Sequence, residues 1–197
     1  MKDIILGHKV ERDELLRQGF VLREGIEEAR KSLDTNLIKV IIGPRRAGKS
    51  VFALQLLQGV DFAYLNFDDE RFVRISDYDD ILKAIIQVYD NTHYLLFDEI
   101  QNLERWELLV NKLQRRGYNL VLTGSNSRLL STGLASHLTG RYLQFQVLPF
   151  SLFISGTLPQ DTALEIDAGW NLLSLRINEK KSIDDLISGN EDKIMSV

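Results

Sequence analysis

The chain lacks cysteine and has few histidines. None of its 197 residues is a cysteine, and three are histidines. Without cysteine, disulfide bonds, thiolate metal sites and cysteine nucleophiles are excluded. His8, His93 and His137 lie far apart in the sequence and show no metal-ligand spacing. The sequence therefore offers no metal site of the histidine or cysteine kind.

Long apolar runs and an excess of basic charge are also missing. No run approaches the ~18 apolar residues that span a bilayer, and the N-terminal "MKDIILGHK" has too few consecutive apolar residues for a signal-peptide core. The formal net charge is −4, which argues against a generally basic surface for nucleic acid but leaves a local patch open. These features predict a cytoplasmic protein without a membrane segment.

Short apolar runs alternate with helical patterns along the chain. A buried strand is expected at 37–42, further strands at 62–67, 93–102, 119–127 and 142–148, and helices at 49–59, 77–90 and 105–117. This alternation predicts an α/β three-layer sandwich, in which helices cover both faces of a five-stranded, mainly parallel sheet. Ligands of such sheets bind at the carboxyl ends of the strands.

Three segments are expected along the chain. Residues 1–36 form a helical leader packed beside the sheet, with helical character over 10–33. Residues 37–156 form the core. The tail, 157–197, offers little apolar surface to offset its ordering cost of about 1–2 kcal/mol per residue, so we expect it to pack loosely, as a truncated or fused segment.

The stretch "GPRRAGKS" has the spacing of a phosphate-binding loop. Its eight residues, all candidate nucleotide contacts, are Gly43, Pro44, Arg45, Arg46, Ala47, Gly48, Lys49 and Ser50. Backbone N–H groups can wrap a phosphate only where bulky side chains are absent, and the helix that follows points its positive end at the same place. Lys49 can reach the outer phosphates, and Ser50 can ligate Mg²⁺. The alternative is a basic turn, in which Arg45 and Arg46 are solvated charges.

The stretch "YLLFDE" ends an apolar strand on Asp98 and Glu99. In a phosphate-binding protein this pattern places Asp98 at the magnesium ion and Glu99 at the attacking water. The alternative is that two acids open a loop. Because strand 62–67 intervenes in the sequence between this motif and the glycine-rich loop, the arrangement indicates the additional-strand branch with a catalytic glutamate.

Further polar residues lie at the ends of other strands. In "TGSNS", Ser125 is the first candidate and Asn126 the second for a group that senses the terminal phosphate, unless they cap the next turn. The acids of "YLNFDDE" either line the site or form a solvated loop. Arg141 can neutralise charge in the transition state, within the chain or from a neighbouring subunit, or form an ordinary ion pair.

Taken together, "GPRRAGKS", "YLNFDDER", "LLFDEIQN", "LTGSNS" and "GRYLQFQVLPFS" resemble the archaeal- and bacterial-type AAA+-like ATPases, a group related to the STAND NTPases. The resemblance implies that residues 43–50 bind ATP and Mg²⁺, that Asp98 and Glu99 are the Walker B pair, and that Ser125 is the sensor. It also places Arg141 in a signature that closes the core. Relatives continue into a helical or winged-helix lid.

Two functions from different classes follow. The first is an Mg²⁺-dependent ATPase, with a homo-oligomer or a protein client as partner. The second is a nucleotide-binding switch with little turnover, because no lid-length segment follows the core. A GTPase is not indicated, since no D-x-x-G follows Asp98 and "NKLQ" lacks the acid of a guanine-reading motif. A transporter ATPase is not indicated either, because the sequence contains no L-S-G-G-Q run.

Overall fold

The computed structural model describes residues 1–74, 77–90, 92–125, 129, 138, 140–149, 151–152 and 172–173. Asn126 and almost all of the expected tail, 157–197, lie outside these residues. The chain divides into two compact units, Met1–Leu148 and Pro149–Val197. In the second unit, the described strands β6 (Ser151–Leu152) and β7 (Leu172–Leu173) pair in parallel.

The first unit is built on a five-stranded sheet in which every strand pair is parallel. Its strands are β1 (Ile38–Gly43), β2 (Phe62–Asn66), β3 (Tyr94–Asp98), β4 (Asn119–Ser125) and β5 (Tyr142–Gln146). They lie in the order β2-β3-β4-β1-β5. The predicted parallel α/β sheet is thus confirmed.

The strand order separates the two motif strands. Strand β4 lies between β1, which leads into the glycine-rich loop, and β3, which ends at Asp98. The additional-strand arrangement is therefore present, with β4 as the strand between them in space. Strand β2, which intervenes in the sequence, lies at the edge of the sheet.

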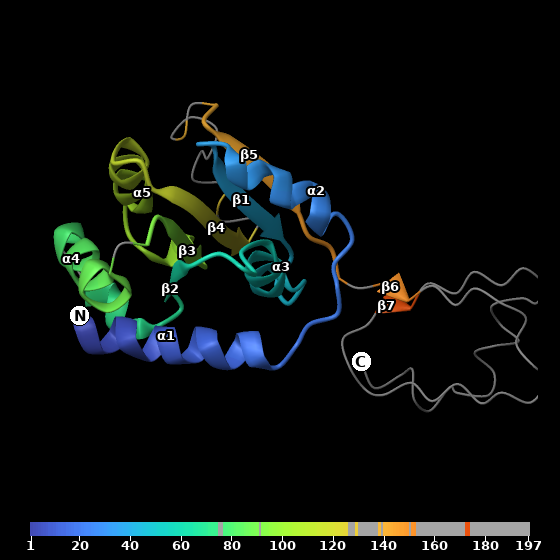
Figure 1. Cartoon of the computed structure of the whole chain (residues 1–197), viewed down its shortest axis with the longest axis horizontal. Helices are drawn as coiled ribbons and strands as arrows, with labels where there is room; N and C mark the ends of the chain where they lie inside the picture. The colour runs from blue at the N-terminus through green and yellow to red at the C-terminus, as the bar shows by residue number, and fades with distance from the viewer. Residues whose placement is uncertain are drawn as a thin grey trace, which may run out of the picture. The chain divides into compact units, whose positions relative to one another are not determined.

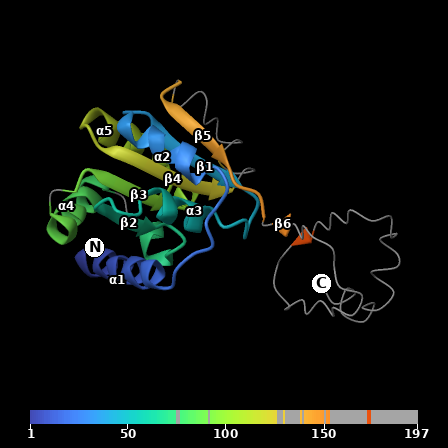
Figure 2. The same ribbon diagram turned by 45° about the vertical axis from the view of Figure 1, so that its right-hand side comes forward.

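Helices cover both faces of the sheet, which gives three layers (Figures 1 and 2). The helices are α1 (Lys2–Arg17), α2 (Ile26–Arg30), α3 (Lys49–Leu56), α4 (Tyr78–Tyr89) and α5 (Trp106–Arg115), with 3₁₀ turns at Lys31–Asp34, Glu70–Arg74 and Ile100–Asn102. Helices α4 and α5 share one apolar core with the sheet, and α2 and α3 share the other. In the described part, no helix has both the length and the apolar character that a membrane crossing requires.

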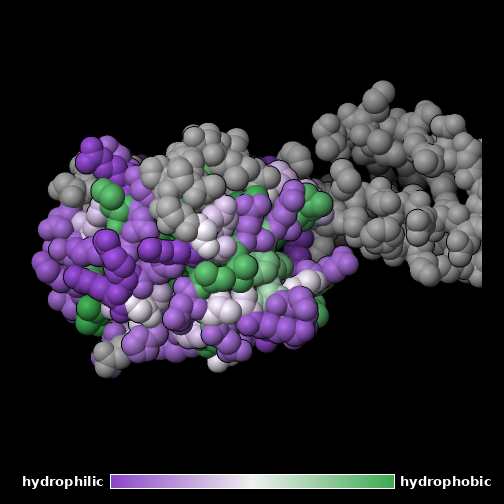
Figure 3. Space-filling model, turned by 90° about the horizontal axis from the view of Figure 1, so that it is seen from above, coloured by the Kyte–Doolittle hydropathy of each residue, from purple (hydrophilic) through white to green (hydrophobic). Residues whose placement is uncertain are grey.

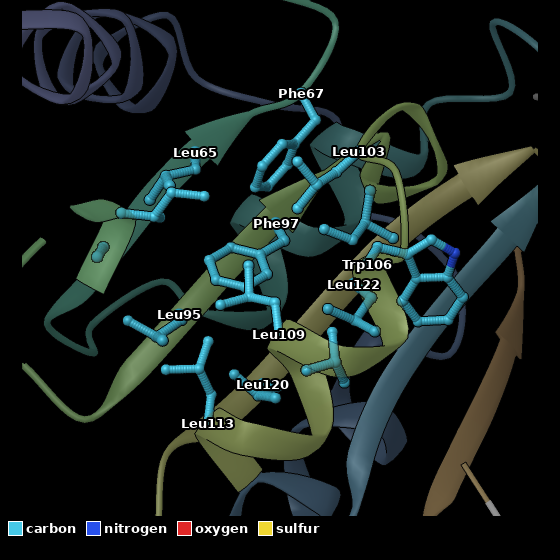
Figure 4. Packing of buried hydrophobic residues seen from close by; sticks show 14 of the residues in the cluster. Leu65, Phe67, Leu95, Phe97, Leu103, Trp106, Leu109, Leu113, Leu120 and Leu122 are labelled. Atoms are coloured by element: carbon cyan, nitrogen blue, oxygen red, sulfur yellow. The ribbon is translucent and has the colours of Figure 1, made fainter. Parts of the chain in front are cut away.

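Alternation along the strands divides the apolar side chains between the two cores. Leu95 and Phe97 of β3 face α4 and α5, whereas Leu96 faces α2 and α3. Figure 4 shows Leu109 and Trp106 of α5 against this first face. The motif residues at the strand ends are therefore held by a frame that is buried on both sides.

Helix α1 lies along the edge strand β2 and hydrogen-bonds to its backbone. The Arg12 guanidinium donates to the Phe62 carbonyl, and the Asn66 amide donates to His8 Nδ1 at 3.4 Å. Arg12 also lies over the rings of Phe62 and Tyr89, 5.1 and 5.2 Å from their centroids. An edge strand otherwise presents unpaired backbone groups, so α1 closes this edge of the sheet.

The predicted helix over 10–33 was wrong in extent. Helix α1 begins at Lys2 and ends at Arg17, and a non-helical segment precedes α2. Gly19 and Gly25 have φ angles of 71° and 78°. Gly19 follows the end of α1, and Gly25 precedes the start of α2. Left-handed conformations interrupt a helix and are accessible to glycine at little cost. The leader therefore crosses the molecule as two helices with an extended segment between them.

Lys39 is a buried cation in the central strand β1. Its side chain is fully buried, and Nζ donates to the Thr35 carbonyl at 2.6 Å. Burial lowers the pKa of Lys39 from 10.5 to about 8, an effect that the nearby charge of Asp34 opposes. The folded state therefore binds the Lys39 proton less tightly than the unfolded state.

This buried lysine makes stability depend on alkaline pH. Between pH 8 and 10.5 the unfolded chain keeps the Lys39 proton and the folded chain loses it, so the Lys39 contribution to the unfolding free energy rises with pH. We expect Lys39→Met to remove this rise in urea denaturation curves, while the exposed Lys31→Met leaves it unchanged. Parallel pH profiles for wild type and Lys39→Met would contradict the assignment.

Candidate functional site

The glycine-rich loop joins the carboxyl end of β1 to the first turn of α3. Gly48 precedes the helix with a φ of 84°, and no side chain caps the helix start. Arg46 also has a left-handed φ, 63°. Alternation of left- and right-handed residues turns successive N–H groups toward one concavity, and uncapped helix amides add further donors. The loop is therefore suited to an anion.

Gly43 lies where the chain after β5 passes over the loop. A Cβ at this position would lie 2.1 Å from the Val147 carbonyl oxygen. Val147 also donates its N–H to the Ile42 carbonyl at 2.8 Å. Only glycine fits such a close backbone approach, so packing alone requires the first glycine of the motif.

Lys49 is buried at the base of the loop. Its Nζ lies 3.2 Å from the Pro44 carbonyl oxygen and 3.3 Å from Glu99 Oε1, and the side chain is 4% exposed. In contrast, Pro44, Arg45 and Arg46 are exposed. The structure thus separates one inward cation from two arginines that extend to the surface, as the sequence indicates.

Asp98 is held by hydroxyl groups from three elements. Its Oδ1 accepts from Ser50 Oγ at 2.9 Å and from Thr123 Oγ1, and its Oδ2 accepts from the Tyr64 hydroxyl at 3.3 Å. Burial raises the pKa of Asp98, while the hydrogen bonds from Thr123 and Ser50 oppose this shift. Ser50 and Asp98, which the sequence analysis assigns to the same magnesium ion, thus lie within hydrogen-bond distance of each other.

Glu99 follows Asp98 in a left-handed conformation, with a φ of 49°. Its N–H donates to Thr123 Oγ1 at 3.0 Å, and Gln101 Nε2 donates to its Oε2 at 2.5 Å. A non-glycine residue in this region costs of order 1–3 kcal/mol and persists where the surroundings hold it. Thr123 and Gln101 supply that hold and direct the carboxylate toward Lys49.

The other predicted site residues divide between the two ends of the sheet. Ser125 pairs in register with Gly43, so it lies beside the loop. Arg141 is exposed and precedes β5, where its carbonyl accepts from the N–H of Ile38 at the amino end of β1. At about 3.3 Å per residue, Ile38 lies roughly 16 Å along the strand from the loop. The structure therefore does not bring Arg141 to the loop of its own chain.

The acids after β2 make structural contacts. Asp68 accepts from Asn102 Nδ2 at 2.6 Å, and Asp69 accepts from Arg71 Nε at 2.9 Å and pairs with His8 Nε2 at 3.0 Å. The hydrogen bond from Arg71 lowers the pKa of Asp69. These contacts tie the loop to α1 and to the turn after β3.

Sequence reasoning missed two residues that contact Asp98. Thr123 shares the polar strand tip of "TGSNS", where it could contact the terminal phosphate or orient water, but the sequence ranks Ser125 and Asn126 above it. In the structure Thr123 Oγ1 hydrogen-bonds to both Asp98 and the Glu99 N–H. Thr123 and Ser125 lie on the same face of the strand, because alternate residues of a strand do. This alternation could have identified Thr123 from the sequence. Tyr64 gave none, because a tyrosine in an apolar strand resembles an ordinary core residue.

The oxygen ligands suit a hard cation. Asp98 and Ser50 offer carboxylate and hydroxyl oxygens, which Mg²⁺ prefers over nitrogen or sulfur. Within the described ranges, no group of three or more His, Cys, Asp or Glu side chains could form a complete metal cage. Magnesium usually keeps waters and binds phosphate oxygens beside one or two protein ligands, so the residues present fit it.

Two relatives of this chain have no described activity. It is 38% identical over 143 residues to the uncharacterized protein MJ1544 of Methanocaldococcus jannaschii, which covers 70% of this chain. It is 40% identical over 131 residues to an uncharacterized protein of Haemophilus influenzae, which covers 60% of this chain. The chain spans 32% of the length of each relative.

Solved structures overlap only in part. DnaA from Aquifex aeolicus bound to AMPPCP is 19% identical, with a TM-score of 0.44 over 66% of this chain and 48% of that chain. The P-loop NTPase domain of a sigma-54 transport activator from E. coli is 18% identical, with a TM-score of 0.42 over 66% of this chain and 99% of that chain. At these scores the strand order given above is the stronger evidence for the fold.

A family model matches most of the chain and identifies its family. Residues 35–153 match the family model of an AAA domain. This range begins before β1 and includes the glycine-rich loop, both acids of β3 and all five strands of the sheet. The chain therefore belongs to the AAA-domain family of P-loop NTPases, a nucleotide-binding family.

Proposed function

We propose that this protein binds ATP with Mg²⁺ and hydrolyses it to ADP and phosphate. The main observation behind the proposal is that two contacts link the start of α3 to the end of β3. Ser50 donates to Asp98 at 2.9 Å, and Lys49 contacts Glu99 at 3.3 Å. A cation, a metal-ligating pair and a candidate base thus lie within one hydrogen-bonded cluster beside an anion-binding loop.

Phosphate binding would use the loop backbone and Lys49. Charge-assisted hydrogen bonds in a buried setting are about twice as strong as neutral ones. Lys49 contacts the loop carbonyl of Pro44 and the carboxylate of Glu99. A phosphate oxygen would take the place of the Glu99 contact, which leaves the glutamate available for chemistry.

Asp98 and Ser50 would hold the magnesium ion. When bound, Mg²⁺ neutralises charge on the outer phosphate oxygens. Thr123 and Tyr64 keep the Asp98 carboxylate in place through hydroxyl donors. The carboxylate therefore needs no large side-chain movement to become a ligand.

Glu99 would accept the proton of the attacking water. Its carboxylate is oriented by Gln101, and its backbone N–H is fixed by Thr123. A base held in this way can contribute 10²–10⁴-fold to the rate. Ser125, beside Gly43 in the sheet register, would contact the terminal phosphate.

Arg141 would act from a neighbouring subunit, since it lies at the other end of the sheet from its own loop. An arginine supplied in trans can stabilise transition-state charge. This role requires a homo-oligomer, which we propose as the active form. We also propose that the protein acts in the cytoplasm, with another protein as its partner.

A nucleotide-binding switch with little turnover is the second candidate. It would apply if Lys49 kept its contact with Glu99 while nucleotide is bound, because the carboxylate would then not be available to a water. Measuring binding and turnover on the same preparation separates the two functions.

Lys49→Ala tests the phosphate site. The loss of a charge-assisted contact worth roughly 1.5–3 kcal/mol should weaken ATP binding about tenfold or more. Isothermal titration calorimetry measures the change, with the exposed Lys83→Ala as the control. Equal affinities for wild type and Lys49→Ala would show that Lys49 does not bind phosphate.

Glu99→Gln tests the base. The amide keeps the shape of the side chain but cannot take a proton, so Mg·ATP binding should persist while phosphate release falls at least about a hundredfold. The exposed Glu104→Gln serves as the control in the same phosphate-release assay. A mutant that hydrolyses ATP at the parental rate rules Glu99 out, and an inert parent that binds ATP favours the switch.

Thr123→Val tests how the acid pair is held. Removal of this hydroxyl leaves the buried Asp98 with one donor fewer, at a cost of roughly 1–3 kcal/mol in unfolding free energy. Thr92→Val loses a neutral hydrogen bond of 2.9 Å to the Asp61 carbonyl and should cost less, about 0.5–1.5 kcal/mol. Urea denaturation measures the unfolding free energy of both variants. Equal decreases for Thr123→Val and Thr92→Val would show that the Thr123 hydroxyl does not stabilise a charged carboxylate.

A further inference from the structure

The extended segment between α1 and α2 is fixed to the helix of the phosphate loop. The Gln55 side chain of α3, which is 3% exposed, hydrogen-bonds to the segment's backbone at two points. Gln55 Nε2 donates to the Val21 carbonyl at 2.6 Å, and the Arg23 N–H donates to Gln55 Oε1 at 3.0 Å. A buried amide satisfied at both ends sets the position of residues 21–23 on α3.

This anchor places the Arg23 guanidinium against the phosphate loop. Arg23 Nη2 donates to the Ala47 carbonyl at 2.6 Å, and Nη1 donates to the Leu148 carbonyl at 3.0 Å. A Cβ on Gly48 would lie 2.1 Å from Nη2. The guanidinium therefore lies directly over Gly48 and joins the loop to the chain that leaves β5.

The contact with the Ala47 carbonyl determines where the next amide points. In a planar trans peptide the C=O and the following N–H point in opposite directions. Because Arg23 holds the Ala47 carbonyl toward itself, the N–H of Gly48 is directed away from Arg23. That amide lies at the start of α3, where the anion of the proposed function would bind.

We propose that Arg23, outside the sequence motif, is a positioning residue that preorganises the Gly48 amide for phosphate. This inference rests on the proposed nucleotide binding. Arg23 acts through the loop backbone and not by contact with the base of the nucleotide. Preorganised donors bind more tightly because they lose less freedom on binding.

Arg30 of α2 offers a matched control, because its guanidinium binds backbone carbonyls at the other end of α3. Arg30 Nη2 donates to the Gln55 carbonyl at 2.7 Å and to the Gln58 carbonyl at 3.4 Å, at the end of α3 far from the loop. Arg23→Gln and Arg30→Gln therefore each remove an arginine that binds backbone carbonyls. Only Arg23→Gln frees a peptide of the phosphate loop.

The binding experiment uses the full chain with ATP and with inorganic triphosphate, in isothermal titration calorimetry. Arg23→Gln should weaken both ligands by the same factor, about tenfold. Arg30→Gln should change neither by more than about twofold. Arg23→Lys, which cannot bridge two carbonyls as the guanidinium fork does, should fall between wild type and Arg23→Gln. Unchanged affinities, or a loss for ATP without a loss for triphosphate, overturn the inference.

A second measurement needs no nucleotide. The order parameter of the Gly48 N–H, measured by 15N relaxation, should be lower in Arg23→Gln than in wild type and in Arg30→Gln, at equal thermal unfolding midpoints. Arg23→Lys keeps the charge and serves if Arg23→Gln fails to fold. An unchanged order parameter at Gly48 overturns the inference even if the protein binds ATP. If wild type binds neither ligand, the proposed function fails, while the relaxation result still decides the role of Arg23.

Discussion

The buried carboxylate of Asp98 is the group on which the organisation of the site depends. An ionised carboxyl removed from water is costly unless donors surround it, and here Ser50, Thr123 and Tyr64 supply hydroxyls from three separate elements. Each donor fixes one element relative to β3: the start of α3, strand β4 and the edge strand β2. The same hydrogen bonds that make burial tolerable thus align the loop, the acids and the polar strand tip.

Much of the fold could be predicted because it follows from local patterns. Apolar runs marked the five strands, and their alternation with helices implied parallel pairing. The carboxyl ends of parallel strands meet at one edge, so the proximity of Ser50 to Asp98 followed from the motifs alone. The helix over 10–33 failed because its charged pattern was weighed above Gly19 and Gly25, whose left-handed angles interrupt it.

The contacts of Tyr64 and Arg23 depend on tertiary packing and leave no trace in a single sequence. Tyr64 reaches Asp98 only because β2 pairs beside β3. Arg23 reaches Ala47 only because Gln55 anchors the segment before α2. For Arg141 the sequence left a role within the chain and a role from a neighbouring subunit open, and the strand register puts it at the opposite end of the sheet from its own loop.

Helix α1 makes the two edges of the sheet unequal. Arg12 and His8 occupy backbone groups of β2 that another strand would otherwise use, whereas no described strand pairs beyond β5. Exposed edges are where sheets recruit additional strands, from partners or from copies of the same chain. A strand added beside β2 would therefore first have to displace the contacts that Arg12 and His8 make with the β2 backbone.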